Sequence, residues 1–131
     1  LMASIFTKIV KGEIPAYKIA EDENFLAFLD VFPLSKGHVL VIPKQEIDSI
    51  FDLSDESYTN LWLFAKKTAK ALKRVMPCKR VGIAVIGLEV PHAHIHLIPL
   101  QNVEDINFSK PKLKVEDAEM KGIAENIKEK F

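Results

Sequence analysis

The sequence predicts an α+β fold in a single domain. Its expected elements follow the order helix, three strands, long helix, two strands, helix. Antiparallel hairpins dominate this order and regular βαβ alternation is absent, which favours an antiparallel sheet. A chain of 131 residues also fits one hydrophobic core. We therefore expect one domain over residues 2–131, with its core at about 4–100 and a connector and final helix at about 101–131.

The first half of the chain is expected to form a short helix and three strands. Residues 4–10 suit a helix because Ser4 is a favourable N-cap. Residues 17–20 and 25–29 flank an acidic turn, which indicates a β-hairpin. A loop rich in turn residues then leads to a β-branched strand at 38–42.

The second half is expected to form the main helix, two strands and a final helix. Over residues 54–76, apolar side chains recur every three or four positions, as on one buried helix face. Strands follow at 81–86 and 90–98. A polar connector at 101–114 then leads to an amphipathic helix at about 115–130.

Composition excludes several classes of partner and location. The 18 basic residues balance the 18 acidic ones, so no overall positive field attracts nucleic acid. No apolar run reaches the roughly 18 residues that suggest a membrane span, and the lone Cys78 cannot form an internal disulfide. Because a secretory signal is also missing, we expect a cytoplasmic protein without membrane or nucleic-acid partners. Leu1 precedes Met2, and we interpret Met2 as the natural start.

The four histidines are the main chemical signal. His38 opens one expected strand, while His92, His94 and His96 alternate along another. Alternate residues of a strand share a face, so three imidazoles should form a row with neighbours about 6.6 Å apart and ends roughly 13 Å apart. A chance gathering of four structural histidines is a poor explanation of this pattern.

The row suits phosphate chemistry better than metal binding. A tetrahedral zinc needs all ligand nitrogens about 2.0 to 2.1 Å from one point, and neither CxxC nor HExxH accompanies the histidines. Zinc held by His92, His94 and a third group stays possible but is not favoured, and we expect no required cofactor. One neutral imidazole can attack phosphorus while its neighbours stabilise the nonbridging oxygens. The central His94 is best placed for this attack.

The segment HAHIHLI at residues 92–98 resembles the histidine triad (HIT) motif, in which three histidines alternate with apolar residues. The upstream sequence SIFTKIVKGEIPAYKIAEDENFLAFLDVFPLSKGHVLVIPK is similar to the N-terminal half of the Hint-like branch of this family. The resemblance extends over about residues 4–100. It implies a HIT-like α+β subunit whose five-stranded antiparallel sheet pairs with a second copy into a ten-stranded homodimer.

The resemblance also implies an enzyme, a nucleoside phosphoramidase or related nucleotide hydrolase. By position in the motif, His94 is the nucleophile that forms a nucleotidyl-histidine intermediate. His92 and His96 are expected to bind phosphate oxygens and assist the leaving group, and His38 is expected to orient His94.

The resemblance further implies a site for a purine nucleotide such as AMP. Phe6, Phe28 and Val31 are expected to form an apolar wall against the purine, and Asp30 is expected to hold the ribose hydroxyls. The sequence alone does not distinguish adenine from guanine.

Three positions depart from the family pattern. Glu89 stands where the family usually carries serine or threonine, so a carboxylate is expected among the nucleotide-facing residues. The usual asparagine is replaced by Ala84 or Val85, and the usual arginine by Leu100. Because a carboxylate repels phosphate, Glu89 predicts either reduced activity or a cationic leaving group. Two alternatives therefore stay open, which are a nucleotide-binding regulatory or interaction module with little turnover and a dinucleoside polyphosphate hydrolase.

Overall fold

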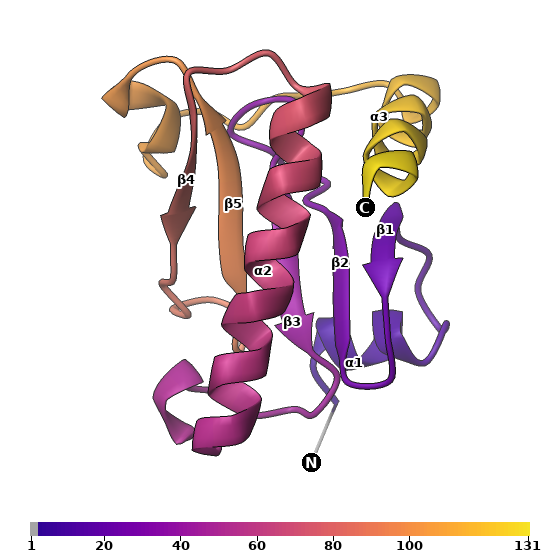
Figure 1. Ribbon diagram of the computed structural model, residues 1–131, viewed down its shortest axis with the longest axis vertical. Coiled ribbons are helices and arrows are strands. Elements are labelled where there is room, and N and C mark those ends of the chain that lie inside the picture. The colour runs from indigo at the N-terminus through magenta and orange to yellow at the C-terminus, as the bar shows by residue number, and fades with distance from the viewer. Residues whose placement is uncertain (1–2) are drawn as a thin grey trace.

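The structure, a computed structural model, describes residues 3–131, so the interpretation of Leu1 and Met2 lies outside the described residues. The expected order of helices and strands is confirmed (Figure 1). The elements are α1 (Ile5–Val10), β1 (Lys18–Glu21), β2 (Phe25–Leu29), β3 (Val39–Pro43), α2 (Asp55–Val75), β4 (Arg80–Ala84), β5 (Ile95–Leu100) and α3 (Asp117–Lys130). Two short 3-10 helices, η1 (Ile50–Asp52) and η2 (Val103–Ile106), were not expected from the sequence.

The five strands form one antiparallel sheet in the order β1-β2-β3-β5-β4. Helices α2 and α3 cover one face, and α1 lies against the other (Figure 1). The strand β2 serves both faces, because Ala27 and Leu29 belong to the core under α2 while Leu26 and Phe28 belong to the core with α1. Burial on both faces explains why β2 and β3 are apolar without alternation.

Local sequence signals position the long helix α2. The Ser54 side chain accepts a hydrogen bond from the Ser57 backbone N–H at 3.1 Å, which satisfies a free donor of the first turn. Acidic residues occupy the first turn and basic residues the last turn, as the helix dipole favours. Within residues 3–131, no helix combines the length and apolar character needed to cross a membrane.

The prediction of a strand over residues 90–98 is wrong in its first half. β5 begins only at Ile95, and residues 85–94 form a loop without regular structure. Pro91 has no N–H to donate, and the Ala93 N–H donates to the Ile47 carbonyl at 2.7 Å instead of to a neighbouring strand. His92 and His94 therefore lie on a loop that leads into the sheet.

Candidate active site

A cavity of about 560 Å³ lies where α1, the end of β2, the start of β3, the 85–94 loop and the connector after β5 meet. It contains eight of the nine residues predicted for the site. These eight are Phe6, Phe28, Asp30, Val31, His38, Glu89, His94 and His96. The exception is His92, which does not line the cavity.

The backbone fixes which nitrogen of His94 carries the proton. Its Nδ1 lies 2.7 Å from the carbonyl oxygen of His92. Because a carbonyl only accepts, His94 Nδ1 must donate, and the neutral ring then has its lone pair on Nε2. The ring is 7% exposed and lines the cavity. His94 therefore has the unprotonated nitrogen that a nucleophile requires.

A second chain of hydrogen bonds fixes the protons of His38 and His96. The Leu34 backbone N–H donates to His38 Nδ1 at 3.1 Å, which leaves the proton on His38 Nε2. His38 Nε2 lies 2.9 Å from His96 Nδ1, so His38 donates and His96 carries its own proton on Nε2. His96 is thereby prepared as a donor. His38 was expected to orient His94. In the structure its side-chain hydrogen bond is to His96.

The conformation of Gly37 allows His38 to reach this position. Gly37 has φ +89°, a region that side-chain-bearing residues rarely adopt. A Cβ added there would also lie 2.7 Å from Met76 Cγ. The tight turn places His38 immediately before β3 with its side chain buried beside His96.

The role expected for His92 in binding phosphate oxygens stays a prediction, and the structure shows where the His92 ring is bonded. Its Nδ1 lies 2.8 Å from Ser4 Oγ, and its Nε2 lies 2.8 Å from the Pro43 carbonyl oxygen. Both ring nitrogens are thus bonded within the protein, and the ring is fully buried. The even row of three imidazoles is wrong, since His94 and His96 ring centroids are only 4.9 Å apart.

All four imidazoles are neutral near pH 7. Burial, reinforced by the neighbouring His96, lowers the pKa of His38 to about 3. Burial, with His94 nearby, lowers the pKa of His96 to about 4. Burial likewise lowers the pKa of His92 and of His94. Neutrality keeps the His94 lone pair available.

An aromatic cluster forms the wall expected for the base. The Phe6 ring meets the Phe28 ring edge-on at 5.5 Å and the His94 ring at 5.0 Å between centroids. Both phenylalanines are buried, whereas Val31 is 54% exposed at the cavity rim. The wall therefore continues from the imidazoles to the opening of the cavity, as an apolar ligand surface requires.

Asp30 is held in a fixed orientation inside the cavity. Its Oδ1 accepts the Phe32 backbone N–H at 2.8 Å, and its Oδ2 lies 3.6 Å from His38 Nε2. The second contact is not an ion pair, because His38 is neutral. Burial raises the pKa of Asp30, although the bond from Phe32 opposes this effect. A carboxylate with lone pairs still free suits the binding of hydroxyl groups.

The proton positions bear on metal binding. Asp30, His38 and His96 offer ligand atoms within 4.8 Å of one another. A bridging ion would need lone pairs on both His38 Nε2 and His96 Nδ1, yet a single proton already joins these atoms. The alternative zinc site using His92 fits no better, since both of its nitrogens are bonded.

Two residues of the connector complete the cavity and were missed from the sequence. Phe108 meets His96 edge-on at 4.8 Å between ring centroids, and Lys112 is a further lining residue. The Lys112 ammonium donates to the Phe108 carbonyl at 2.7 Å, and the Leu113 N–H donates to the Pro33 carbonyl at 2.8 Å. The sequence signal that could have identified this segment is Phe108, the one aromatic residue in the polar connector at 101–114. Lys112 supplies a positive charge at the cavity, whereas Leu100, at the position of the family's usual arginine, supplies none.

This geometry can be compared with known proteins. The sequence pattern of the HIT domain matches residues 11–103. The adenosine 5'-monophosphoramidase hnt1 of Schizosaccharomyces pombe is 39% identical over 133 residues, with 99% of each chain covered.

Solved structures agree with the sequence comparison. A Hit-like protein from Bartonella henselae, described as involved in cell-cycle regulation, superposes with a TM-score of 0.86 at 26% identity, covering 98% of this chain and 96% of its own. A zinc-bound histidine triad family protein from Mycobacterium smegmatis gives a TM-score of 0.84 at 28% identity, covering 98% and 93%. The chain therefore belongs to the histidine triad (HIT) family and has its α+β fold.

Proposed function

We propose that this HIT-family chain is a nucleotide hydrolase or transferase that acts on the α-phosphate of purine nucleoside phosphoramidates. The observation that carries the proposal is His94, whose Nδ1–H is bonded to the His92 carbonyl and whose Nε2 lone pair is free beside the cavity. The relative from Schizosaccharomyces pombe, named an adenosine 5'-monophosphoramidase, supports the substrate class.

In the first step, His94 Nε2 attacks phosphorus and a P–N(imidazole) bond forms. The bond from phosphorus to the leaving nitrogen breaks, and that nitrogen keeps the electron pair and takes a proton from water. Positive charge develops on the His94 ring, and the His92 carbonyl 2.7 Å from Nδ1 stabilises it. His96 Nε2–H donates to a nonbridging phosphate oxygen.

In the second step, water attacks the nucleotidyl group on His94. The P–N bond breaks, its electron pair returns to Nε2, the attacking water loses a proton to solvent, and the nucleoside monophosphate is released. An alcohol or amine in place of water gives a transferase. Two displacements at phosphorus replace one difficult displacement, as covalent catalysis generally allows.

The remaining cavity residues suit a purine nucleoside. The base packs against Phe6, Phe28 and Val31, and the ribose hydroxyls donate to Asp30. Lys112 adds a positive charge on the connector side of the cavity. This placement puts the α-phosphate beside His94 and His96.

Steady-state release of amine from adenosine 5'-phosphoramidate tests the proposal. We expect turnover by the wild type and its loss in His94→Ala, with AMP binding retained in both by calorimetry. Turnover that survives in His94→Ala would refute the role of His94. AMP binding without turnover by the wild type would favour the binding-module alternative.

Glu89 is the observation that favours this alternative. Its carboxylate lines the same cavity, and its negative charge also contributes to raising the pKa of Asp30. Two carboxylates facing a phosphate repel it unless a cation intervenes. A cationic leaving group reconciles Glu89 with turnover, and dinucleoside polyphosphates, which are more anionic, should be poor substrates.

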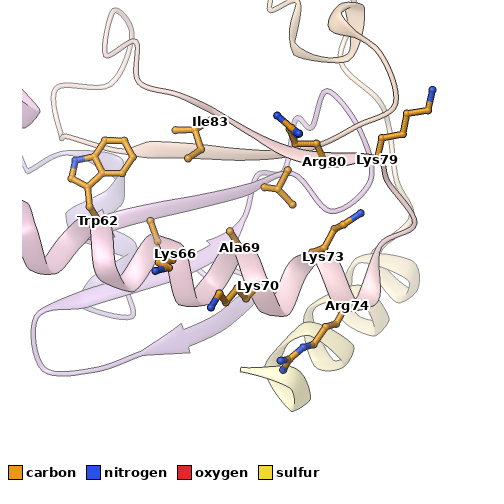
Figure 2. Close-up of a pocket in the computed structure, with 11 residues that line it drawn as sticks. Trp62, Lys66, Ala69, Lys70, Lys73, Arg74, Lys79, Arg80 and Ile83 are labelled. Atoms are coloured by element: carbon orange, nitrogen blue, oxygen red, sulfur yellow. The ribbon is translucent and has the colours of Figure 1, made fainter.

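We also propose that the enzyme is a homodimer joined through β4. This strand is a sheet edge, and an unpaired edge with apolar side chains is a ready template for strand pairing. A groove of about 660 Å³ lies between α2 and β4. Figure 2 shows Trp62 and Ile83 at one end of this groove and Lys73, Lys79 and Arg80 at the other.

The apolar end of the groove supports pairing with a second copy. Ile83 is 51% exposed, and Trp62 Nε1 is buried without a hydrogen-bond partner among the described residues. Antiparallel pairing of two β4 strands would produce the ten-stranded sheet and cover Ile83. Light scattering should give a dimer for the wild type and a monomer for Ile83→Asp. The control Val103→Asp, at an even more exposed apolar position on η2, should stay dimeric. A monomeric wild type at micromolar concentration would refute the proposal.

A further inference from the structure

A cluster of four polar residues lies behind the cavity and is not explained by nucleotide binding. It joins Ser4 and Thr7 at the start of α1, Glu46 after β3, and His92 on the loop before β5. Glu46 Oε1 accepts the Ser4 backbone N–H at 2.7 Å and the Thr7 hydroxyl at 2.6 Å. Ser4 Oγ lies 2.8 Å from His92 Nδ1.

The shortest contacts assign the protons of this cluster, and they are shorter than the contacts of Thr7 Oγ1 with Ser4 Oγ at 3.3 Å and with His92 Nδ1 at 3.4 Å. The Pro43 carbonyl can only accept, so His92 Nε2 carries the proton and Nδ1 is an acceptor. Ser4 Oγ–H must then donate to His92 Nδ1, while the same oxygen accepts the Thr7 backbone N–H at 3.0 Å. Thr7 donates its own hydroxyl proton to Glu46.

Glu46 is the acceptor that begins this chain of bonds. The hydrogen bonds from Thr7 and Ser4 hold the pKa of its carboxyl below the usual range, so it is ionised at neutral pH. An ionised carboxylate cannot donate, which leaves both of its partners as donors. The Glu46 carboxylate thereby holds both the Ser4 backbone N–H and the Thr7 hydroxyl in place.

The cluster ends one step from the proposed nucleophile. His92 is bonded at both ring nitrogens, and its carbonyl accepts the His94 Nδ1–H at 2.7 Å. Without the hydrogen bond from Ser4, the buried His92 Nδ1 would lack a donor. The His92 ring, and with it the His92 carbonyl, would then be held less firmly. The tautomer of His94 depends on that carbonyl.

We infer that Ser4, held by Thr7 and Glu46, is a positioning residue that holds the His92 ring at Nδ1 and thereby aims the His92 carbonyl at His94. The inference rests on the proposed function, because it assigns Ser4 to the chemical step of that reaction. Ser4 touches neither substrate nor reacting atoms. Its expected effect is therefore on kcat rather than on nucleotide affinity.

A purely structural role for Ser4 makes a different prediction. Ser4 also caps α1, and α1 carries Phe6 in the nucleotide wall. If capping were its whole contribution, loss of the hydroxyl would loosen Phe6 and weaken AMP binding. The chain offers a matched control, because Ser54 caps α2 in the same way and has no hydrogen bond to a histidine among residues 3–131.

The test compares Ser4→Ala, Ser4→Thr and Ser54→Ala with the wild type. Long-range ¹H–¹⁵N correlation spectra report the tautomers and the hydrogen bonding of the histidine ring nitrogens, and amine release and AMP calorimetry report kcat and affinity. In Ser4→Ala we expect His92 to keep its proton on Nε2, because Pro43 is unchanged, while its Nδ1 resonance moves to that of an acceptor without a hydrogen bond. We also expect a kcat lowered about tenfold, as loss of one buried hydrogen bond allows, with AMP affinity retained. Ser4→Thr should restore both the spectrum and kcat, and Ser54→Ala should change neither.

Three outcomes would overturn the inference. They are an unchanged His92 Nδ1 resonance in Ser4→Ala, a kcat within about twofold of the wild type, or a fall in AMP affinity that matches the fall in kcat. If Ser4→Ala does not fold, Glu46→Gln tests the same chain of bonds through an exposed residue, with the same readouts. Absence of amine release by the wild type would refute the proposed function alone, since the His92 Nδ1 resonance still decides whether Ser4 holds the ring.

Discussion

Mild acid should destabilise this protein because its active-site imidazoles are buried in their neutral form. The pKa of His96 is lowered to about 4 and that of His38 to about 3, in both cases chiefly by burial. In the unfolded chain both rings titrate near the ordinary pKa of about 6.5. As pH falls below this value, the unfolded chain binds protons that the folded chain does not, and the free energy of unfolding decreases. Stability is complete above about pH 6.5 and is lost toward pH 4.

The size of the effect follows from the pKa of His96. The difference between 6.5 and about 4 corresponds to about 3 kcal/mol, of which about 2 kcal/mol is lost by pH 5. His38 is hydrogen-bonded to His96, so its protonation is not independent and the two effects do not simply add. Asp30 acts in the opposite direction, because burial raises its pKa and its protonation favours the folded chain as pH falls. A loss of 2 kcal/mol is large beside the roughly 5 to 15 kcal/mol of a typical domain.

Urea unfolding monitored by circular dichroism between pH 7 and pH 5 measures this loss. We expect the free energy of unfolding of the wild type to fall by about 2 kcal/mol over that interval. His96→Asn should show a smaller slope, because it removes one of the buried rings that take up a proton on unfolding. A wild-type value independent of pH, or an equal slope in His96→Asn, would refute the reasoning.

Four further predictions concern the nucleotide site. Asp30→Asn should weaken AMP binding about tenfold but change the binding of 2',3'-dideoxy-AMP little, as calorimetry with both ligands would reveal. Glu89→Ser should raise kcat/KM for a neutral leaving group relative to a cationic one, and an unchanged ratio would exclude Glu89 from leaving-group selection. Lys112→Ala should weaken binding of AMP more than of adenosine, whereas Lys114→Ala on the same connector should affect neither. Treatment with EDTA should leave amine release unchanged, because we propose that no metal is required; lost activity restored by zinc would contradict this.

The sequence was sufficient for the fold because the relevant signals are local. The N-cap and apolar stripe of α2 lie within the helix itself, and the alternation of short apolar runs with turn residues defined the strands. The unexpected loop at 85–94 has a different origin. Its Ala93 N–H finds a partner at Ile47, 46 residues away, and strand periodicity contains no information about such a contact.

The sequence predicted which residues line the cavity better than it predicted their hydrogen-bond partners. Alternation of histidines identified His94 and His96. It could not reveal that Ser4, 88 residues away, is hydrogen-bonded to the ring of His92. Phe108 and Lys112 were missed for the same reason. Their segment has no periodicity, and distant contacts, such as the hydrogen bond of Leu113 with Pro33 and the contact of Phe108 with His96, bring it back over the cavity.

The helix α1 has a consequence for how the nucleotide is held. A helix of six residues is too short to be stable in isolation, so α1 exists only while it is docked on the sheet and tied to His92. Phe6, one wall of the cavity, is therefore present only in that docked state. A nucleotide that packs on Phe6 binds the docked state alone, so ligand binding and the attachment of the N-terminal segment form a single linked equilibrium. Saturation with nucleotide should slow the exchange of the α1 amide hydrogens with solvent, far more than that of amides in α3.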